Sequence, residues 1–80
     1  MKMDEVVSAL ELARDTCICG FIEVTIPGQD ATETIVNWSD SLDNKIEYYK
    51  GVYDENGRHR MNDRIRIVNA GGCKPVKNLT

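Results

Sequence analysis

The sequence predicts an α+β fold in which an N-terminal helix packs on a four-stranded antiparallel β-meander. Three observations lead to this prediction: helical spacing of apolar residues near the N-terminus, strand-like alternation after it, and an Asn-Gly turn in the second half of the chain. Eighty residues fit one small domain spanning 1–80, within which we expect residues 70–80 to form a loose tail. A hydrophobic content of 41% with 29% charged residues is typical of a globular chain.

Residues 3–17 are expected to form an amphipathic helix. Apolar residues at spacings of three and four make one stripe along it: Met3, Val6, Val7, Leu10, Ala13 and Cys17. We expect Asp4 to cap the start of this helix and Gly20 to end it. The opposite side of the helix is acidic and carries Glu5, Glu11 and Asp15.

Two strands are expected after the helix. Residues 21–26 alternate in polarity, which predicts a strand, and Pro27-Gly28 then predicts a turn. Residues 31–38 are rich in β-branched side chains, which favours a second strand. A helix is the alternative there, because Asp30 and Glu33 could form a capping box at its start.

The helical alternative would continue along one stripe, formed by Ile35, Trp38, Leu42, Ile46 and Tyr49. It would have to pass through residues 39–44, where serine, aspartate and asparagine favour turns. It would also remove Ile46 and Tyr49 from the hairpin described next. For these reasons we prefer the strand.

Residues 45–68 are expected to form a β-hairpin that turns at Asn56-Gly57, because a type I′ turn needs positive φ at both central positions. A two-residue loop fixes the register of such a hairpin. On the expected inner face it pairs Val52 with Met61, Tyr48 with Ile65, and Ile46 with Ile67. On the outer face it pairs Tyr53 with Arg60, Tyr49 with Arg64, and Glu47 with Arg66.

The outer face of this hairpin is the predicted binding surface. Its candidate residues are Tyr49, Tyr53, Arg58, Arg60, Arg64 and Arg66. Tyrosine and arginine are enriched in protein–protein hot spots, and together they can also neutralise phosphates and stack on bases. The acidic helix face of Glu5, Glu11 and Asp15 is the alternative surface, since it could compete with nucleic acid for a basic groove.

Charge is distributed unevenly along the chain and favours a protein partner. The formal net charge is −3, with 4 basic and 12 acidic residues in 1–57 and 6 basic and 1 acidic residue in 58–80. An acidic domain repels a phosphate backbone unless a basic face dominates locally. We therefore expect a larger protein or protein complex as the partner, with nucleic acid as the second choice.

Metal binding and catalysis are not expected. The candidate metal ligands are Cys17, Cys19, Cys73 and His59, but the Cys-x-Cys spacing is shorter than zinc sites usually use and does not repeat. The single histidine comes without a nucleophile motif, and no phosphate-binding loop is present. The sequence thus predicts a non-enzymatic protein without metal or cofactor.

The sequence predicts a cytoplasmic protein. No apolar run reaches the ~20 residues of a membrane-spanning helix, acidic residues stand where a signal peptide would be apolar, and three cysteines suggest free thiols. A small interaction module that acts as an inhibitor or adaptor by covering a partner's surface fits these features. Phage-encoded inhibitors of host defence complexes are often of this size and character, which is an association with a size class only.

Overall fold

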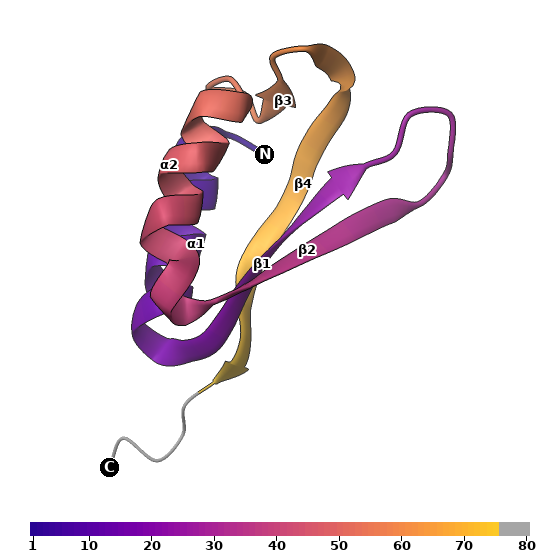
Figure 1. Ribbon diagram of the computed structural model, residues 1–80. Helices are drawn as coiled ribbons and strands as arrows, with labels where there is room; N and C mark the ends of the chain where they lie inside the picture. Colours follow the sequence, from indigo (N-terminus) through magenta and orange to yellow (C-terminus); the bar gives the residue numbers. More distant parts are fainter. Residues whose placement is uncertain (76–80) are drawn as a thin grey trace.

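The computed structural model describes residues 1–75 of the chain (Figure 1). Its elements in order are α1 (Met3–Thr16), β1 (Cys17–Thr25), β2 (Thr32–Trp38), the 3-10 helix η1 (Ser39–Ser41), α2 (Leu42–Val52), β3 (Arg58–His59) and β4 (Asn62–Pro75). No helix within these residues is long and apolar enough to cross a membrane.

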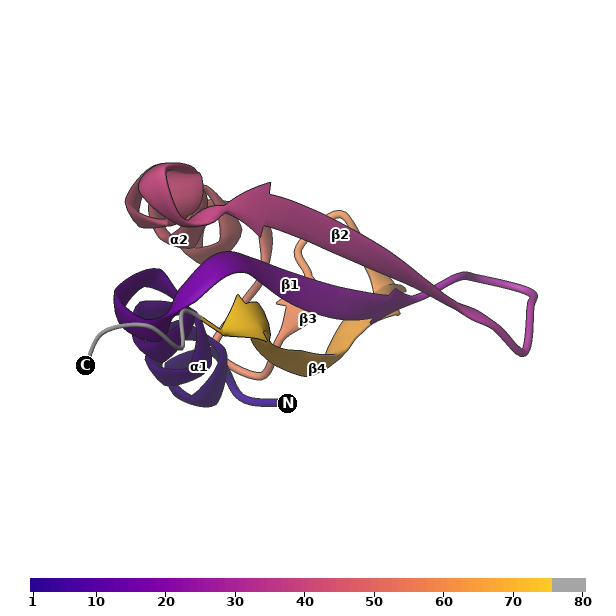
Figure 2. The same cartoon turned by 90° about the horizontal axis from the view of Figure 1, so that it is seen from below.

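The four strands form one antiparallel sheet in the order β2-β1-β4-β3. Both helices lie on the same side of this sheet (Figures 1 and 2). The predicted α+β class, with an N-terminal helix on a four-stranded antiparallel sheet, is confirmed. The meander is wrong, because β4 pairs with β1 in the centre of the sheet and a second helix separates β2 from β3.

Helix α1 follows the predicted apolar stripe, with Met3, Val6, Leu10 and Ala13 buried. It begins one residue before Asp4, so Asp4 lies in the first turn instead of capping it. The Glu5 carboxylate accepts the backbone N–H of Lys2 at 3.0 Å and so satisfies one of the free donors at this end.

Gly20 was expected to end α1, but it lies inside β1. The helix ends at Thr16 and leads directly into the strand. A Cβ at Gly20 would lie 3.0 Å from Leu42 Cδ1 and 3.2 Å from Ala13 Cβ, both helix side chains. Glycine is therefore suited to this position because it lets both helices approach the sheet closely.

The predicted hairpin over residues 45–68 is wrong, because Leu42–Val52 forms helix α2. Leu42, Ile46 and Tyr49 recur at spacings of four and three, and burial leaves them 0%, 6% and 4% exposed. Residues 32–38 form strand β2, as preferred. The helical alternative was thus wrong for its first half and right for its second.

Asn56-Gly57 forms a turn between Tyr53 and His59, which form a single antiparallel bridge, and not the tip of a long hairpin over residues 45–68. Asn56 lacks the positive φ that the predicted type I′ turn requires. The Asp54 carboxylate accepts the backbone N–H groups of Asn56 at 2.9 Å and Arg58 at 3.0 Å, and Gly57 has the expected positive φ of 78°. The actual hairpin is β3–β4, which pairs His59 with Asn62.

The outer-face pairs predicted for the hairpin are consequently wrong. Arg66 faces Arg58 across the strands, not Glu47, and Tyr49 and Glu47 belong to α2. Strand β4 continues to Pro75 and pairs with β1, so residues 70–75 are strand where a loose tail was expected. The rest of that predicted tail, residues 76–80, lies outside the described residues.

The core fills the space between the helices and the sheet. Its largest fully buried side chains are Leu10, Ile22, Leu42, Ile67 and Val6. Tyr49 and Tyr53 also belong to this core, and the Asn37 amide donates a hydrogen bond of 2.8 Å to the Tyr49 hydroxyl. The hydroxyl of Tyr49 is thus paired while its ring stays in the apolar core.

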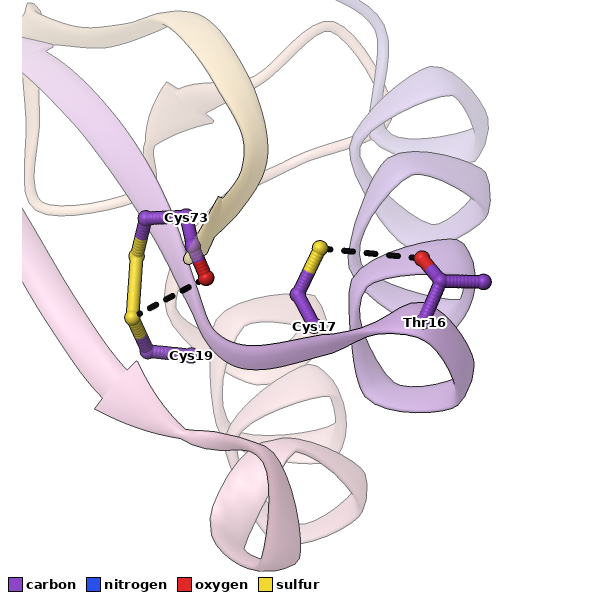
Figure 3. Close-up of a disulfide and its surroundings, with 4 residues drawn as sticks. All are labelled: Thr16, Cys17, Cys19 and Cys73. Atoms are coloured by element: carbon purple, nitrogen blue, oxygen red, sulfur yellow. Dashed lines mark hydrogen bonds between the residues drawn. A yellow bond between two sulfur atoms is a disulfide. The ribbon is translucent and has the colours of Figure 1, made fainter. Parts of the chain in front are cut away.

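Cys19 and Cys73 form a disulfide between the two central strands (Figure 3). They are direct partners in the β1–β4 register, with Cα atoms 5.3 Å apart. In thiol form, the Cys19 sulfur would have the Cys73 carbonyl oxygen as its acceptor at 3.3 Å. The expectation of three free thiols is therefore corrected: Cys17 is the one free, half-buried cysteine among residues 1–75.

Candidate functional site

The sheet has one face covered by helices and one face that no element of residues 1–75 covers (Figure 2). Ile22, Val24 and Ile67 point into the core, so their strand neighbours point away from it. We call this uncovered side the open face. Its residues are Cys19, Phe21, Glu23 and Thr25 of β1, Thr32, Thr34, Val36 and Trp38 of β2, and Arg64, Arg66, Asn69, Gly71 and Cys73 of β4.

One end of the open face is apolar. Trp38 is 63% exposed and Val36 is 56% exposed, and each directly faces a β1 residue in the register, Cys19 and Phe21 respectively. Phe21 covers Gly71 on the neighbouring strand, where a Cβ would lie 3.2 Å from its ring. A hollow of about 430 Å³ lies here between Trp38, Val36, Lys74 and the disulfide. We call this region the apolar end.

The middle of the open face holds a fixed carboxylate. Glu23 accepts hydrogen bonds from the Asn69 amide at 2.9 Å and the Thr32 hydroxyl at 3.0 Å. The bond from Asn69, followed by that from Thr32, lowers the pKa of Glu23 below its usual value, because both stabilise the ionised form. A negative charge therefore stands at the centre of this face at neutral pH.

The other end of the open face is basic. The Thr25 hydroxyl accepts the Arg66 backbone N–H at 2.9 Å and donates to the Arg64 carbonyl at 2.8 Å, which fixes β4 beside β1. The two arginines and Arg58 line a hollow of about 460 Å³ next to the β1–β2 loop. We call this region the basic end. The open face thus runs from apolar through acidic to basic along its strands.

The structure brings together only part of the predicted Tyr/Arg surface. Arg58, Arg64 and Arg66 share the basic end. Tyr49 and Tyr53 do not belong to this surface, because they are only 4% and 6% exposed in the core. Burial raises the pKa of both hydroxyl groups.

Arg60 is also absent from this site, because it holds the end of helix α2. Its guanidinium donates to the Gly51 carbonyl at 3.1 Å and to the Lys50 carbonyl at 3.3 Å. These are carbonyls of the last turn, which have no partner inside the helix. Arg60 therefore has a structural role.

The alternative acidic surface is partly neutralised. Asp15 pairs with Arg14 at 3.0 Å, and this hydrogen bond lowers the pKa of the Asp15 carboxyl. Arg14 also reaches Asp43 of helix α2 at 2.6 Å. Glu5 binds the backbone of its own helix, which leaves Glu11 as the member without such a contact among residues 1–75. Among residues 1–75, Asp15 is therefore the one member of this helix face with a basic side-chain partner.

The candidate metal ligands are not brought together. Cys19 and Cys73 pair with each other, and His59 lies edge-on against Tyr53 with the ring centroids 5.3 Å apart. Over residues 1–75, no three histidine, cysteine or acidic side chains are arranged to hold a metal ion.

Sequence reasoning missed Phe21, Val36 and Trp38 as site residues. A signal for them was present, because β1 and β2 carry large apolar side chains at both odd and even positions. A strand that buries only one face needs them on that face alone. Comparisons of this chain with protein-family models, curated proteins and solved structures find no match, so its function is argued from this geometry alone.

Proposed function

We propose that this protein is a non-enzymatic interaction module that binds a larger protein through the open face of its sheet. The observation that carries this proposal is the apolar end, where Trp38 and Val36 are more than half exposed beside Phe21. Covering a surface of its partner would make the protein an inhibitor or an adaptor.

The chemistry of the apolar end suits protein recognition. Tryptophan is among the residues most enriched in binding hot spots, since burial of its large ring removes much apolar surface from water. Trp38 and Val36 also project from a strand paired to the centre of the sheet, and the disulfide lies beside them. A rigid support reduces the entropy lost on binding.

No catalytic role is assigned to His59. The Met61 backbone N–H donates to His59 Nδ1 at 3.0 Å, and the ring packs against Tyr53. These contacts hold the His59 side chain against the β3–β4 turn and the Tyr53 ring. The proposal is therefore one of binding without chemistry.

Nucleic-acid binding is a second candidate, favoured by the position of Arg64 and Arg66 on the same face as Phe21 and Trp38. An exposed sheet with arginines and aromatic rings can hold phosphates and stack bases. The Glu23 carboxylate argues against it, because it stands between the basic end and the aromatic side chains. A strand of nucleic acid using both ends would have to pass over this charge.

The test is capture of a partner from an extract of the natural host, with the wild-type protein, Trp38→Ala and Tyr48→Ala compared by quantitative mass spectrometry. Tyr48 is a matched control, since it is 58% exposed on the helix layer. We expect one partner to be enriched by wild type and Tyr48→Ala, and to bind Trp38→Ala about thirtyfold more weakly.

A partner that binds Trp38→Ala as well as wild type would contradict the proposal. Binding to single-stranded nucleic acid that falls steeply with salt, with no Trp38-dependent protein partner, would support the second candidate instead.

A further inference from the structure

Three arginines line the hollow at the basic end, and two of them are directly opposite each other in the sheet. Arg58 and Arg66 are register partners between β3 and β4, and Arg64 lies two residues from Arg66 on the same side of β4. Like charges placed directly opposite each other on a sheet destabilise it. An anion bound between the two arginines would reduce this repulsion.

The surroundings supply little negative charge to relieve them. Among residues 1–75, neither Arg64 nor Arg66 forms an ion pair, and Arg58 has a loose pair with Asp54 at 3.7 Å. Of the described residues, Asp63 is the only acidic one that lines the hollow of about 460 Å³. The remaining walls come from the β1–β2 loop and the end of β1.

We propose that the basic end binds side-chain carboxylates from an acidic segment of the partner protein. This inference rests on the proposed function, because it names the chemistry of the partner that covers the open face. Arginine suits the role, since its planar fork donates two parallel hydrogen bonds to one carboxylate.

The order of the apolar end, the central Glu23 carboxylate and the basic end along the open face favours a protein segment over a phosphate backbone. Phosphates repeat at every nucleotide, so a nucleic acid that reached Phe21 and Trp38 would meet the ionised Glu23 on the way. A protein segment can place acidic residues against Arg64 and Arg66 and apolar ones against Trp38. It can also place a neutral donor opposite Glu23.

The experiment uses a fluorescent octa-glutamate peptide with blocked ends, and octa-glutamine as its uncharged counterpart, in anisotropy titrations with the full chain. We expect the glutamate peptide to bind, the glutamine peptide not to bind, and the affinity to fall as salt is added. The double variant Arg64→Gln with Arg66→Gln should bind at least about tenfold more weakly, since hydrogen bonds to charged groups are lost.

The matched control is Lys45→Gln with Lys50→Gln on helix α2, which removes the same charge from another surface. This variant should retain most of the binding. Equal losses in the two double variants would mean that net charge alone attracts the peptide, and would overturn the proposal. So would the absence of binding, or tighter binding of an oligothymidine with eight phosphates than of the glutamate peptide.

Thermal unfolding separates a binding role from a structural one. Because Arg58 and Arg66 repel each other, Arg66→Gln should unfold at the same temperature as wild type or higher. A clearly lower unfolding temperature would show that Arg66 supports the fold, and would overturn the proposal. If peptide binding fails while Trp38-dependent partner capture persists, the anion site fails and the proposed function stands.

Discussion

Ile22 and Val36 are β-branched apolar residues on the adjacent strands β1 and β2, yet Ile22 is 0% exposed and Val36 is 56% exposed. The difference comes from the face of the sheet on which each side chain lies. Ile22 lies in the core under the helices, and Val36 lies on the opposite, open face by the strand register. Both helices pack on one side of the sheet, and no element of residues 1–75 covers the other side (Figure 2). Side chains of similar chemistry are therefore buried in the core on one side of the sheet and exposed on the other.

This comparison separates stability from recognition. The covered face holds the buried side chains on which a chain of this size depends, since small domains bury a limited share of their surface. The open face contributes a disulfide and a graded set of exposed side chains. Substitutions on the two faces should therefore affect different measurements.

The largest expected difference is between Ile22→Ala and Val36→Ala. Removing a fully buried isoleucine leaves a cavity and should reduce the free energy of unfolding by about 2–5 kcal/mol. The exposed Val36 should change it by less than about 0.5 kcal/mol. Urea unfolding of the two variants measures both, and equal losses would show that the open face is covered in solution.

The disulfide should have the next largest effect. Cys19 and Cys73 are separated by 54 residues in sequence, and removing such a crosslink costs about 2–4 kcal/mol. The double variant Cys19→Ser with Cys73→Ser should therefore unfold at a lower temperature than wild type. Adding reductant should shift the wild type toward the variant and leave the variant unchanged.

Thiol alkylation followed by mass spectrometry provides the control for that prediction. Without reductant, Cys17 should be the single cysteine labelled in the unfolded protein, and all three should be labelled after reduction. Labelling of three cysteines without reductant, or a Tm that ignores reductant, would contradict the crosslink between β1 and β4.

The smallest predicted effect is a loss of folding stability at alkaline pH, caused by the tyrosines that are buried in the core. Burial raises the pKa of Tyr49 and Tyr53, so the neutral hydroxyls are favoured in the folded state. Their contribution is complete below the unfolded pKa of about 10 and is lost as pH rises through the higher folded pKa. Stability should therefore decline at alkaline pH.

A variant with Tyr49→Phe and Tyr53→Phe should show a shallower alkaline decline in thermal unfolding. Tyr48→Phe is the control, because Tyr48 is exposed on the same helix and should follow wild type. A decline in the double variant as steep as that of wild type would assign the effect to other groups.

Local patterns predicted the first half of the fold and failed in the second. Helix α1 shows one period clearly, and alternation and β-branched residues favoured the strands β1 and β2; the structure contains all three with shifted ends. Residues 45–52 fit both periods, since Ile46 and Tyr48 alternate as in a strand while Ile46 and Tyr49 are spaced as in a helix. The turn at Asn56-Gly57 is present, but it closes only the bridge between Tyr53 and His59 and not a hairpin over residues 45–68.

The candidate site was predictable in part. Alternation placed Arg58, Arg64 and Arg66 on one face of the predicted hairpin. The structure brings them together in another way, because Arg58 lies on β3 directly opposite Arg66 on β4. Tyr49 and Tyr53 were misplaced because their position depended on the hairpin. The apolar end could not be located, since it requires knowing which face of β2 the helices leave open.

The sequence by itself determined the α+β class, helix α1, the first two strands, the turn at Gly28 and the positive φ of Gly57, because periodicity and glycine preference act within a few residues. Tertiary structure decided the rest. Residues 42–52 form a helix because helical geometry buries Leu42, Ile46 and Tyr49 together in the core. Burial by distant residues chose between two local structures that the segment alone leaves nearly equal, and the same choice left Trp38 exposed.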